Sequence, residues 1–392
     1  MDPAILVINS GSSSLKFSLI DIASHLVLIS GIAEKLGLPD GYLTVKYSSK
    51  ETFPLLPPNH VGAMENIVTI LQHYQLSDRI LAVGHRVVHG GEQFKSSTLI
   101  DHSVLLEIER CIPFAPLHNP AHLEGIRAAM KFAPNIPHVA VFDTAFHQTL
   151  SPTAFLYALP KYLYVEHGVR RYGFHGTSHR YVSMEAARFL GLDIQDSAFI
   201  TAHLGNGASA AAILNGKSVD TTMGFTPLEG LVMGTRSGDI DPALVTYIAE
   251  RLGISANEVV NLLNKKSGLL GISELSSDVR DLQDAAANGH EGAQLALDIF
   301  VHRLAKYIAA LTVSLPRVDA LVFTGGIGEN AALIREKTIR KLAVLGYSLD
   351  AEANQRLIGG NQGIITTPNS TKAMVINTNE ELMIALDTAK FL

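Results

Sequence analysis

Residues 8–19, INSGSSSLKFSL, interrupt a strand-like apolar run with one glycine and four hydroxyl side chains, and the run resumes behind Lys16. Backbone N–H groups and hydroxyls in a Gly-Ser-rich turn between two strands can hold an anion, so phosphate is the first candidate. A solvated hairpin turn explains the same composition, because Gly and Ser dominate turns in general. The segment lacks the Walker A spacing, and a strand follows it where a helix should stand. Asn9, directly before the turn, offers a neutral oxygen that suits a magnesium-bound water.

Two further glycine-rich segments could also approach a ligand. HLGNG, residues 203–207, has two glycines within three residues, which an ordinary turn explains equally well. GIGENA, residues 326–331, follows a strand, opens a helix and matches the dinucleotide fingerprint. Its late position, with Asp350 as the only acid near the expected offset, makes that match weak. A helix N-terminus that holds nucleotide phosphate or ribose fits the same residues at least as well.

Two arginines are candidates for binding anions. Arg86, in GHRVVHGG, stands beside two valines in what reads as a buried strand, so it needs either a structural carboxylate or an anionic substrate. Arg236, in MGTRSGDIDP, lies on a Gly-rich loop and could stabilise a transferring phosphoryl group. It could equally pair with Asp239 or Asp241. The sequence leaves both choices open.

One carboxylate and a histidine pair complete the candidates. Asp143, in VFDTAFHQT, ends an apolar strand, where α/β sheets usually place ligand-facing residues, although a cap for a helix or turn is the structural alternative. His175 and His179, in RYGFHGTSH, have the spacing of two zinc ligands on a helix. No Glu follows His175 and Gly176 stands between the two histidines, so a zinc site is not favoured. A hydrogen-bonded structural role is the default for either ring.

The elements that must position these residues form two similar halves. Strand patterns flank the first turn, and residues 198–214 repeat the order of strand, Gly-rich turn and strand. Helical patterns follow each hairpin, including one expected from about 329 to 343. Helix-end signals are clear at Asp241-Pro242, at Ser255 with Glu258, and at Asn379. The pattern predicts an α/β fold with a ligand cleft between the two halves.

Composition limits the function classes. With 392 residues, 47% hydrophobic and 17% charged, the chain is long enough for two well-packed domains. A net charge of -6 gives no electrostatic footprint for nucleic acid or anionic lipid. The start resembles no signal peptide, no apolar run is long enough to cross a membrane, and Cys111 is the only cysteine. A cytoplasmic protein is therefore expected.

The ordered set of motifs resembles the acetate kinase family. In that family's order, from residue 9 to residue 381, the chain carries NSGSSSLK, GHRVVHGG, PLHNP, FDTAFHQT, RYGFHGTSH, HLGNGAS, TPLEGLVMGTRSGDIDP, FTGGIGEN and TNEE. The resemblance implies two duplicated actin-like (ribonuclease H-like) domains, with mixed sheets flanked by helices and the active site in the interdomain cleft. We expect an acyl-kinase lobe at 1–147 plus 379–392 and a nucleotide-binding lobe at 148–378.

The same resemblance implies reversible phosphoryl transfer from ATP to acetate, giving acetyl phosphate and ADP, by a homodimer that uses magnesium or manganese. Arg86 would bind the acetate carboxylate and Asp143 would be the active-site carboxylate. His175 and Arg236 would steady the transition state, with His118 nearby. The pocket for the acetate methyl group would be lined by Val88, Leu117, Phe174 and Pro227.

The remaining implied residues surround ATP and the metal. Asn9 and Glu380 would hold the metal directly or through water, although Asn377 stands where the family usually has proline, which loosens the loop before Glu380. The ATP site would comprise Ser12, Ser14, Lys16, His203, Leu204, Gly205, Asn206, Gly207, Asp278, Val279, Arg280, Gly326, Ile327, Gly328, Glu329 and Asn330.

Acetate has a pKa near that of a glutamate side chain, about 4.3, so at pH 7 it needs no general base. We therefore expect Asp143 to orient a cation or a metal-bound water, while cations bring acetate to the anionic γ-phosphate. The main alternative is a propionate or other short-chain acyl kinase, against which Val88 argues because related propionate kinases tend to carry a smaller residue there. A nucleotide-gated chaperone or filament protein of the same superfamily would leave Arg86 unexplained, and an NAD-dependent enzyme built on GIGENA is least favoured.

Overall fold

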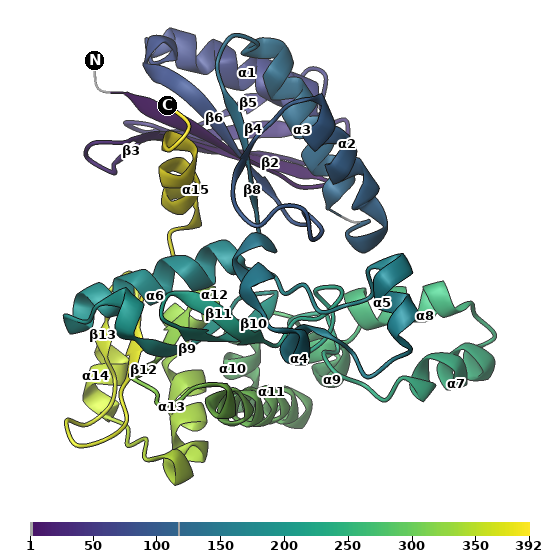
Figure 1. Ribbon diagram of the computed structural model, residues 1–392, viewed down its shortest axis with the longest axis vertical. Helices are drawn as coiled ribbons and strands as arrows, with labels where there is room; N and C mark the ends of the chain where they lie inside the picture. Colours follow the sequence, from purple (N-terminus) through teal and green to yellow (C-terminus); the bar gives the residue numbers. More distant parts are fainter. Residues whose placement is uncertain (1–2, 117) are drawn as a thin grey trace. The chain divides into compact units, whose positions relative to one another are not determined.

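The computed structural model describes residues 3–116 and 118–392, and Leu117 lies outside them. The chain divides into two compact units (Figure 1). Unit 1 comprises Met1–Gln148 and Asn379–Leu392, and unit 2 comprises Thr149–Thr378. Among the described residues, no helix combines the length and apolar character needed to cross a bilayer.

Unit 1 is built on a mixed sheet with strand order β5-β4-β3-β2-β1-β6-β8-β7. The first strands form antiparallel pairs, whereas β1, β6 and β8 run parallel. Helix α15 returns from the C-terminal end of the chain to pack on β1, β6 and β8. The strands are β1 (Ala4–Ser10), β2 (Ser14–Asp21), β3 (Val27–Glu34), β4 (Tyr42–Lys46), β5 (Lys50–Pro54), β6 (Ile80–Val87), β7 (Thr98–Leu99) and β8 (His138–Phe142). The helices are α1 (His60–His73), α2 (His102–Arg110), α3 (Asn119–Phe132) and α15 (Glu380–Ala389).

Unit 2 has a second mixed sheet with strand order β11-β10-β9-β12-β14-β13. Its strands are β9 (Ala198–Leu204), β10 (Ala208–Leu214), β11 (Lys217–Thr221), β12 (Ala320–Thr324), β13 (Gly363–Ile364) and β14 (Ala373–Val375). Its helices are α4 (Pro152–Phe155), α5 (Lys161–His167), α6 (Gly176–Leu190), α7 (Ala243–Leu252), α8 (Ala256–Lys265), α9 (Gly268–Ser273), α10 (Val279–Ala287), α11 (Glu291–Leu311), α12 (Gly325–Asn330), α13 (Ala332–Lys341) and α14 (Ala351–Arg356).

The two units share one construction. Each begins its sheet with an antiparallel hairpin, β1–β2 or β9–β10, and in each the first strand of the hairpin pairs in parallel with a later strand. Central strands such as β9 and β12 are buried along their whole length, as expected when helices cover both faces of a sheet. The predicted pair of hairpin-led α/β halves is confirmed.

Several helix ends follow the predicted capping chemistry. The Asn379 side chain accepts from the Leu382 N–H at the start of α15, and Ser255 with Glu258 forms a full capping box on α8. At α7 the structure differs by one position, because Pro242 is the N-cap and Asp241 accepts from the Ala243 N–H instead.

The predicted start of the helix at about residue 329 is wrong. The chain turns helical at Gly325, leaves the helical conformation at Ala331 and resumes in α13. Arg335, fully buried, explains the break, since its Nη1 donates to the carbonyls of Gly328 and Glu329 that a continuous helix would use internally.

Candidate functional site

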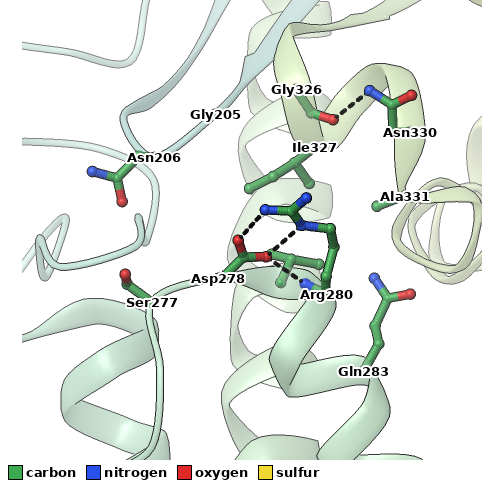
Figure 2. Close-up of a pocket in the computed structure, with 11 residues that line it drawn as sticks. Gly205, Asn206, Ser277, Asp278, Arg280, Gln283, Gly326, Ile327, Asn330 and Ala331 are labelled. Atoms are coloured by element: carbon green, nitrogen blue, oxygen red, sulfur yellow. Dashed lines mark hydrogen bonds and ion pairs between the residues drawn. The ribbon is translucent and has the colours of Figure 1, made fainter. Parts of the chain in front are cut away.

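A pocket of about 630 Å³ opens in unit 2, which is within the usual size of small-molecule sites (Figure 2). Three segments meet there: the β9–β10 turn, the start of α10, and α12 with the residue after it. The lining residues are Gly205, Asn206, Ser277, Asp278, Val279, Arg280, Gln283, Gly326, Ile327, Asn330 and Ala331. The structure thus brings together most of the expected ATP residues of unit 2.

One side of this pocket carries a fixed guanidinium group. Asp278 caps α10 by accepting from the Arg280 N–H at 2.8 Å, and it also binds the Arg280 side chain through Nε at 3.1 Å and Nη2 at 2.6 Å (Figure 2). The Arg280 side-chain hydrogen bond is the largest cause that lowers the pKa of Asp278. Arg280 itself stays 87% exposed, so its flat face is available to a ligand.

Other expected ATP residues of unit 2 lie around the pocket without lining it. Leu204 is buried, and a Cβ on Gly325 would come within 2.7 Å of its carbonyl oxygen, which explains the glycine at that position. Glu329 Oε1 accepts from the backbone N–H groups of Gly325 and Thr378, so this carboxylate holds the loop together. His203 and Gly328, also expected at ATP, are likewise outside the lining.

Beside the pocket, the side chains of Arg236 and His175 converge on Gly207. A Cβ added to Gly207 would lie 3.4 Å from Arg236 Nη1 and 3.5 Å from His175 Nε2. Gly207 is the third residue of the turn whose first two residues, Gly205 and Asn206, line the pocket. The absence of a side chain there leaves room for a ligand atom between the two nitrogens.

Arg236 is a partly buried cation with no carboxylate partner within residues 3–116 and 118–392. Its Nη1 donates to the Pro227 carbonyl at 3.0 Å and lies 3.8 Å from Met233 Sδ. Burial lowers the pKa of Arg236 below its ordinary value. The possible pairing with Asp239 or Asp241 is not observed. Such a cation is suited to receive an anion from a substrate.

Three side chains absent from our predictions hold the loop that carries Pro227 and Arg236. Arg171 donates to Glu229 at 2.6 Å and to the carbonyls of residues 221–223. Tyr157 donates to Glu229 and accepts from the Phe225 N–H. Burial, followed by the charge of Glu229, raises the pKa of Tyr157, so the phenol stays protonated. Tyr157 and Arg171 lie far from this loop in the sequence, so the sequence analysis could not predict these hydrogen bonds.

His175 stands at the N-cap of α6 with a left-handed backbone, φ 57°. Its Nδ1 lies 2.8 Å from Ser209 Oγ, and His179 Nε2 lies 2.7 Å from the same oxygen. In the described part of the chain, no group of three or more His, Cys, Asp or Glu side chains could hold a metal ion. The pair is thus organised around a serine hydroxyl, in line with the hydrogen-bonded reading.

In unit 1, Arg86 pairs with Asp143. Parallel pairing of β6 with β8 places Val87 opposite Phe142, so the two side chains come from adjacent strand ends. Arg86 donates from Nε to Oδ1 at 3.1 Å and from Nη2 to Oδ2 at 2.7 Å. Asp143 is buried, whereas the Arg86 side chain keeps 23% of its surface exposed.

Of the two partners considered for Arg86, a structural carboxylate is observed, namely Asp143. Arg86 can still bind a second anion. Although burial lowers the pKa of Arg86, the charges of Asp143 and Glu380 raise it above its ordinary value. Arg86 Nη1 has no hydrogen-bond partner in the described residues, so it can still bind a ligand.

A buried histidine, His122, lies near Arg86. His122 lies one turn along α3 from His118, with stacked rings 6.4 Å apart, and neither of its ring nitrogens has a partner within the described chain. Burial, followed by the charge of Arg86, lowers the pKa of His122 to about 3. His122 is therefore a neutral ring, which adds no charge beside the Arg86–Asp143 pair.

The first Gly-Ser turn forms in unit 1 as expected. The Gly11 N–H donates to the Ser14 carbonyl at 2.6 Å, and His60 Nε2 lies 2.9 Å from the Gly11 carbonyl. The side chains of Ser12 and Lys16 are exposed and Ser14 is half-buried, so they can reach a ligand.

The expected metal and acyl residues are divided between the units. Asn9 is half-buried at the end of β1, and Glu380 opens α15 in the same unit. Val88 belongs to unit 1, whereas Phe174 and Pro227 belong to unit 2, and Leu117 lies outside the described residues. Val88 and Phe174 are buried, at 7% and 2% exposure.

Known proteins resemble this chain along its whole length. The model of the acetokinase family matches residues 4–386. An acetate kinase from Chromobacterium violaceum is 58% identical, with 100% of this chain and 98% of that protein covered. Acetate kinase 1 from Neisseria meningitidis serogroup A is 55% identical, with 98% of each chain covered.

Solved structures agree. A propionate kinase from Francisella tularensis superposes with a TM-score of 0.95 at 48% identity, and an acetate kinase from Porphyromonas gingivalis with 0.94 at 46%. Each comparison covers 99% of both chains. The expected architecture of duplicated actin-like domains with mixed sheets is confirmed. The chain belongs to the acetokinase family.

Proposed function

We propose that the protein is an ATP:acetate phosphotransferase that reversibly forms acetyl phosphate and ADP. The observation that carries this proposal is the convergence of Arg236 and His175 on Gly207, beside the pocket of unit 2. A nucleotide in that pocket would present its terminal phosphate to Arg236, a cation that no carboxylate of the described residues neutralises. The relatives named as acetate kinases support the same reaction.

The chemistry needs neutralisation of charge more than proton transfer. Acetate is a carboxylate at pH 7, so it attacks phosphorus without a base. Arg236 stabilises the charge that spreads over the transferring phosphoryl group, and His175 donates to the same oxygens. We also assign His118 a supporting role in this chemistry, as the family resemblance implies.

Acetate binds through Arg86 in unit 1. Asp143 holds the guanidinium group by two hydrogen bonds, and Arg86 Nη1 remains for the carboxylate of acetate. Asp143 is thus an orienting residue, because its oxygens are occupied by Arg86 and no substrate proton needs removal. Unit 1 is the acyl-binding side, unit 2 is the nucleotide-binding side, and turnover requires both.

Magnesium or manganese fits the oxygen donors at Asn9 and Glu380. Mg²⁺ is usually bound through one or two carboxylates together with substrate phosphates, and one amide oxygen with one carboxylate matches that habit. The ion would supply positive charge against the phosphates of ATP. Ser12, Ser14 and Lys16 would also hold the phosphates.

Acetate is favoured over propionate by the size of the methyl pocket. Val88 would restrict the acyl chain, with Leu117, Phe174 and Pro227 completing the wall. One methylene group is worth only about 1–3 kcal/mol of discrimination, so some propionate turnover is expected.

We also propose a cytoplasmic homodimer. Helix α7 buries none of its residues, and its Leu244, Tyr247 and Leu252 are 40%, 62% and 57% exposed. We take these exposed apolar side chains of α7 as the dimer interface. The single cysteine, Cys111, fits a reducing compartment. Light scattering on the wild type and on Tyr247→Glu tests the dimer, which the substitution should weaken.

The test of the function is a hydroxamate assay for acyl phosphate with ATP, magnesium and acetate, propionate or butyrate. Rapid formation of acetyl phosphate and slower formation of propionyl phosphate are expected. ATP hydrolysis without any acyl phosphate would overturn the proposal. Faster turnover of propionate would replace acetate with propionate as the substrate.

A further inference from the structure

A chain of hydrogen bonds runs through the interior of unit 2 and ends at His175. It starts where Thr201 Oγ1 lies 2.7 Å from His179 Nδ1. The other nitrogen of that ring, Nε2, lies 2.7 Å from Ser209 Oγ. Ser209 Oγ in turn lies 2.8 Å from His175 Nδ1. His175 Nε2 is the atom that faces Gly207.

Rigid elements hold the members of this chain. Thr201 and Ser209 lie on the neighbouring strands β9 and β10, and His179 lies in the first turn of α6. All three side chains are fully buried. Water therefore does not compete for their protons, so the direction of each hydrogen bond is set by the chain itself.

Proton counting leaves two directions. A serine hydroxyl has one proton, so Ser209 donates to one imidazole and accepts from the other. If it donates to His175 Nδ1, the neutral His175 ring carries its proton on Nε2. If it donates to His179, then His175 is protonated on Nδ1, and Nε2 presents a lone pair unless the ring is doubly protonated.

Thr201 decides between the two directions. When Ser209 donates to His179 Nε2, His179 carries its proton on Nδ1 and donates it to Thr201 Oγ1. The proton of the Thr201 hydroxyl then needs another acceptor. Within the described ranges, Thr201 Oγ1 has no other hydrogen-bond partner. A buried hydroxyl without an acceptor costs roughly 1–3 kcal/mol. When Ser209 donates to His175 Nδ1 instead, Thr201 donates to His179 Nδ1 and His179 Nε2 donates to Ser209. Each buried hydroxyl then has an acceptor for its proton.

We propose that His179 and Ser209 are positioning residues that hold His175 as the neutral tautomer with its proton on Nε2. Resting on the proposed function, this inference means that His175 donates a hydrogen bond to the transferring phosphoryl group while Arg236 supplies the positive charge. The reversed chain would turn a lone pair toward an anion. The tautomer is thus fixed by residues that never touch the substrate.

The direct test is nitrogen NMR of the histidine rings in the full-length protein labelled with ¹⁵N-histidine. His175→Gln identifies the His175 signals by their loss. The wild type should show a bare Nδ1 and a protonated Nε2 at His175, and Ser209→Ala should shift this ring toward a mixture of tautomers. A wild-type ring protonated on Nδ1, or a tautomer unchanged in Ser209→Ala, would overturn the inference.

Kinetics provide the second readout. Ser209→Ala should lower kcat by roughly 10- to 100-fold, the range found when a metal-bound histidine loses the residue that orients it, with the KM for ATP unchanged. Ser197→Ala is the matched control, because Ser197 is also a fully buried serine of unit 2. Its hydroxyl donates to the Ile194 carbonyl and not to a histidine. Equal kcat values for the two variants would contradict the proposal. A protein that makes no acyl phosphate yet shows the expected tautomer would refute the function and leave the tautomer standing.

Discussion

Arg86 and Arg236 are both partly buried arginines, yet their surroundings differ. Arg86 makes a two-point ion pair with the buried carboxylate of Asp143. Arg236 binds only a backbone carbonyl and a thioether sulfur within residues 3–116 and 118–392. The charge environment shifts the pKa of Arg86 upward, while burial shifts the pKa of Arg236 downward.

The difference indicates two ways of using a cation. Arg86 is a fixed part of the unit 1 structure, and it offers its remaining N–H groups to a small carboxylate. Arg236 is held in place by the loop around Glu229 but keeps its charge for an anion that arrives with the substrate. The first arginine should therefore affect both stability and binding, and the second should affect turnover.

Arg236→Ala should have the largest effect. Because the phosphoryl group would lose its unshared cation, kcat should fall by about 10³- to 10⁵-fold, while nucleotide affinity stays largely intact. The hydroxamate assay gives kcat, and calorimetric titration gives the affinity for ATP. Arg340→Ala, which removes an exposed arginine paired with Glu336, is the control and should keep full activity. An unchanged rate in Arg236→Ala would remove this residue from the site.

The Arg86–Asp143 pair should respond in stability as well as in turnover. Arg86→Gln removes the two hydrogen bonds that the buried Asp143 carboxylate receives from this arginine, and it should lower the free energy of unfolding by about 2–3 kcal/mol. The double variant Arg86→Gln with Asp143→Asn should recover much of that loss and remain inactive. Urea unfolding followed by circular dichroism measures the first effect and the hydroxamate assay the second.

Two results would break the comparison at this pair. One is Arg86→Gln with wild-type stability, which would mean that the ion pair is not part of the structure. The other is Asp143→Asn with wild-type turnover, which would mean that orientation of Arg86 by this carboxylate does not matter for the reaction.

Acidification should reveal the neutral histidine near Arg86. The folded-state pKa of His122 is about 3, whereas an unfolded histidine titrates near 6.5, so between these values the unfolded chain binds the extra proton. Stability therefore rises with pH across this window and is lost as the pH falls. From pH 7.5 to pH 5 the loss due to this ring is about 2 kcal/mol.

His122→Asn isolates that contribution. Urea unfolding at pH 5 and pH 7.5 should show a smaller loss of stability on acidification in the variant than in the wild type. Equal losses in the two proteins would show that His122 is not held neutral.

Val88→Ala should have the smallest effect. Enlarging the methyl pocket should raise the ratio of kcat/KM for propionate to that for acetate by about 10-fold, with little effect on the KM for ATP. Parallel hydroxamate assays with the two acids measure the ratio. An unchanged ratio would place Val88 outside the acyl pocket and leave its burial as ordinary packing.

The sequence predicted local features well because their causes are local. The two hairpins, the capping box at Ser255 and Glu258, and the cap at Asn379 each depend on residues a few positions apart. The break at Ala331 was missed, because it depends on Arg335 in the following helix, whose side chain donates to the last carbonyls of α12.

The site was predicted only in part, because pairing in space decides it. The sequence could not choose a partner for Arg86 until β6 and β8 were known to be neighbours. Gln283 was missed at the pocket, although its place one turn after Val279 on α10 was a usable signal. Ser209 and His179 both lie within recognised motifs, but the hydrogen bond between them joins a strand to a helix. The spacing of residues along the sequence could not predict it.

The central claim is that the point beside Gly207, between Arg236 Nη1 and His175 Nε2, receives the transferring phosphoryl group. The most direct measurement is a crystal structure with ADP, magnesium, acetate and aluminium fluoride as a mimic of that group. We expect the fluoride within hydrogen-bond distance of both nitrogens. An anion bound elsewhere, with Arg236 still donating only to the Pro227 carbonyl, would contradict it.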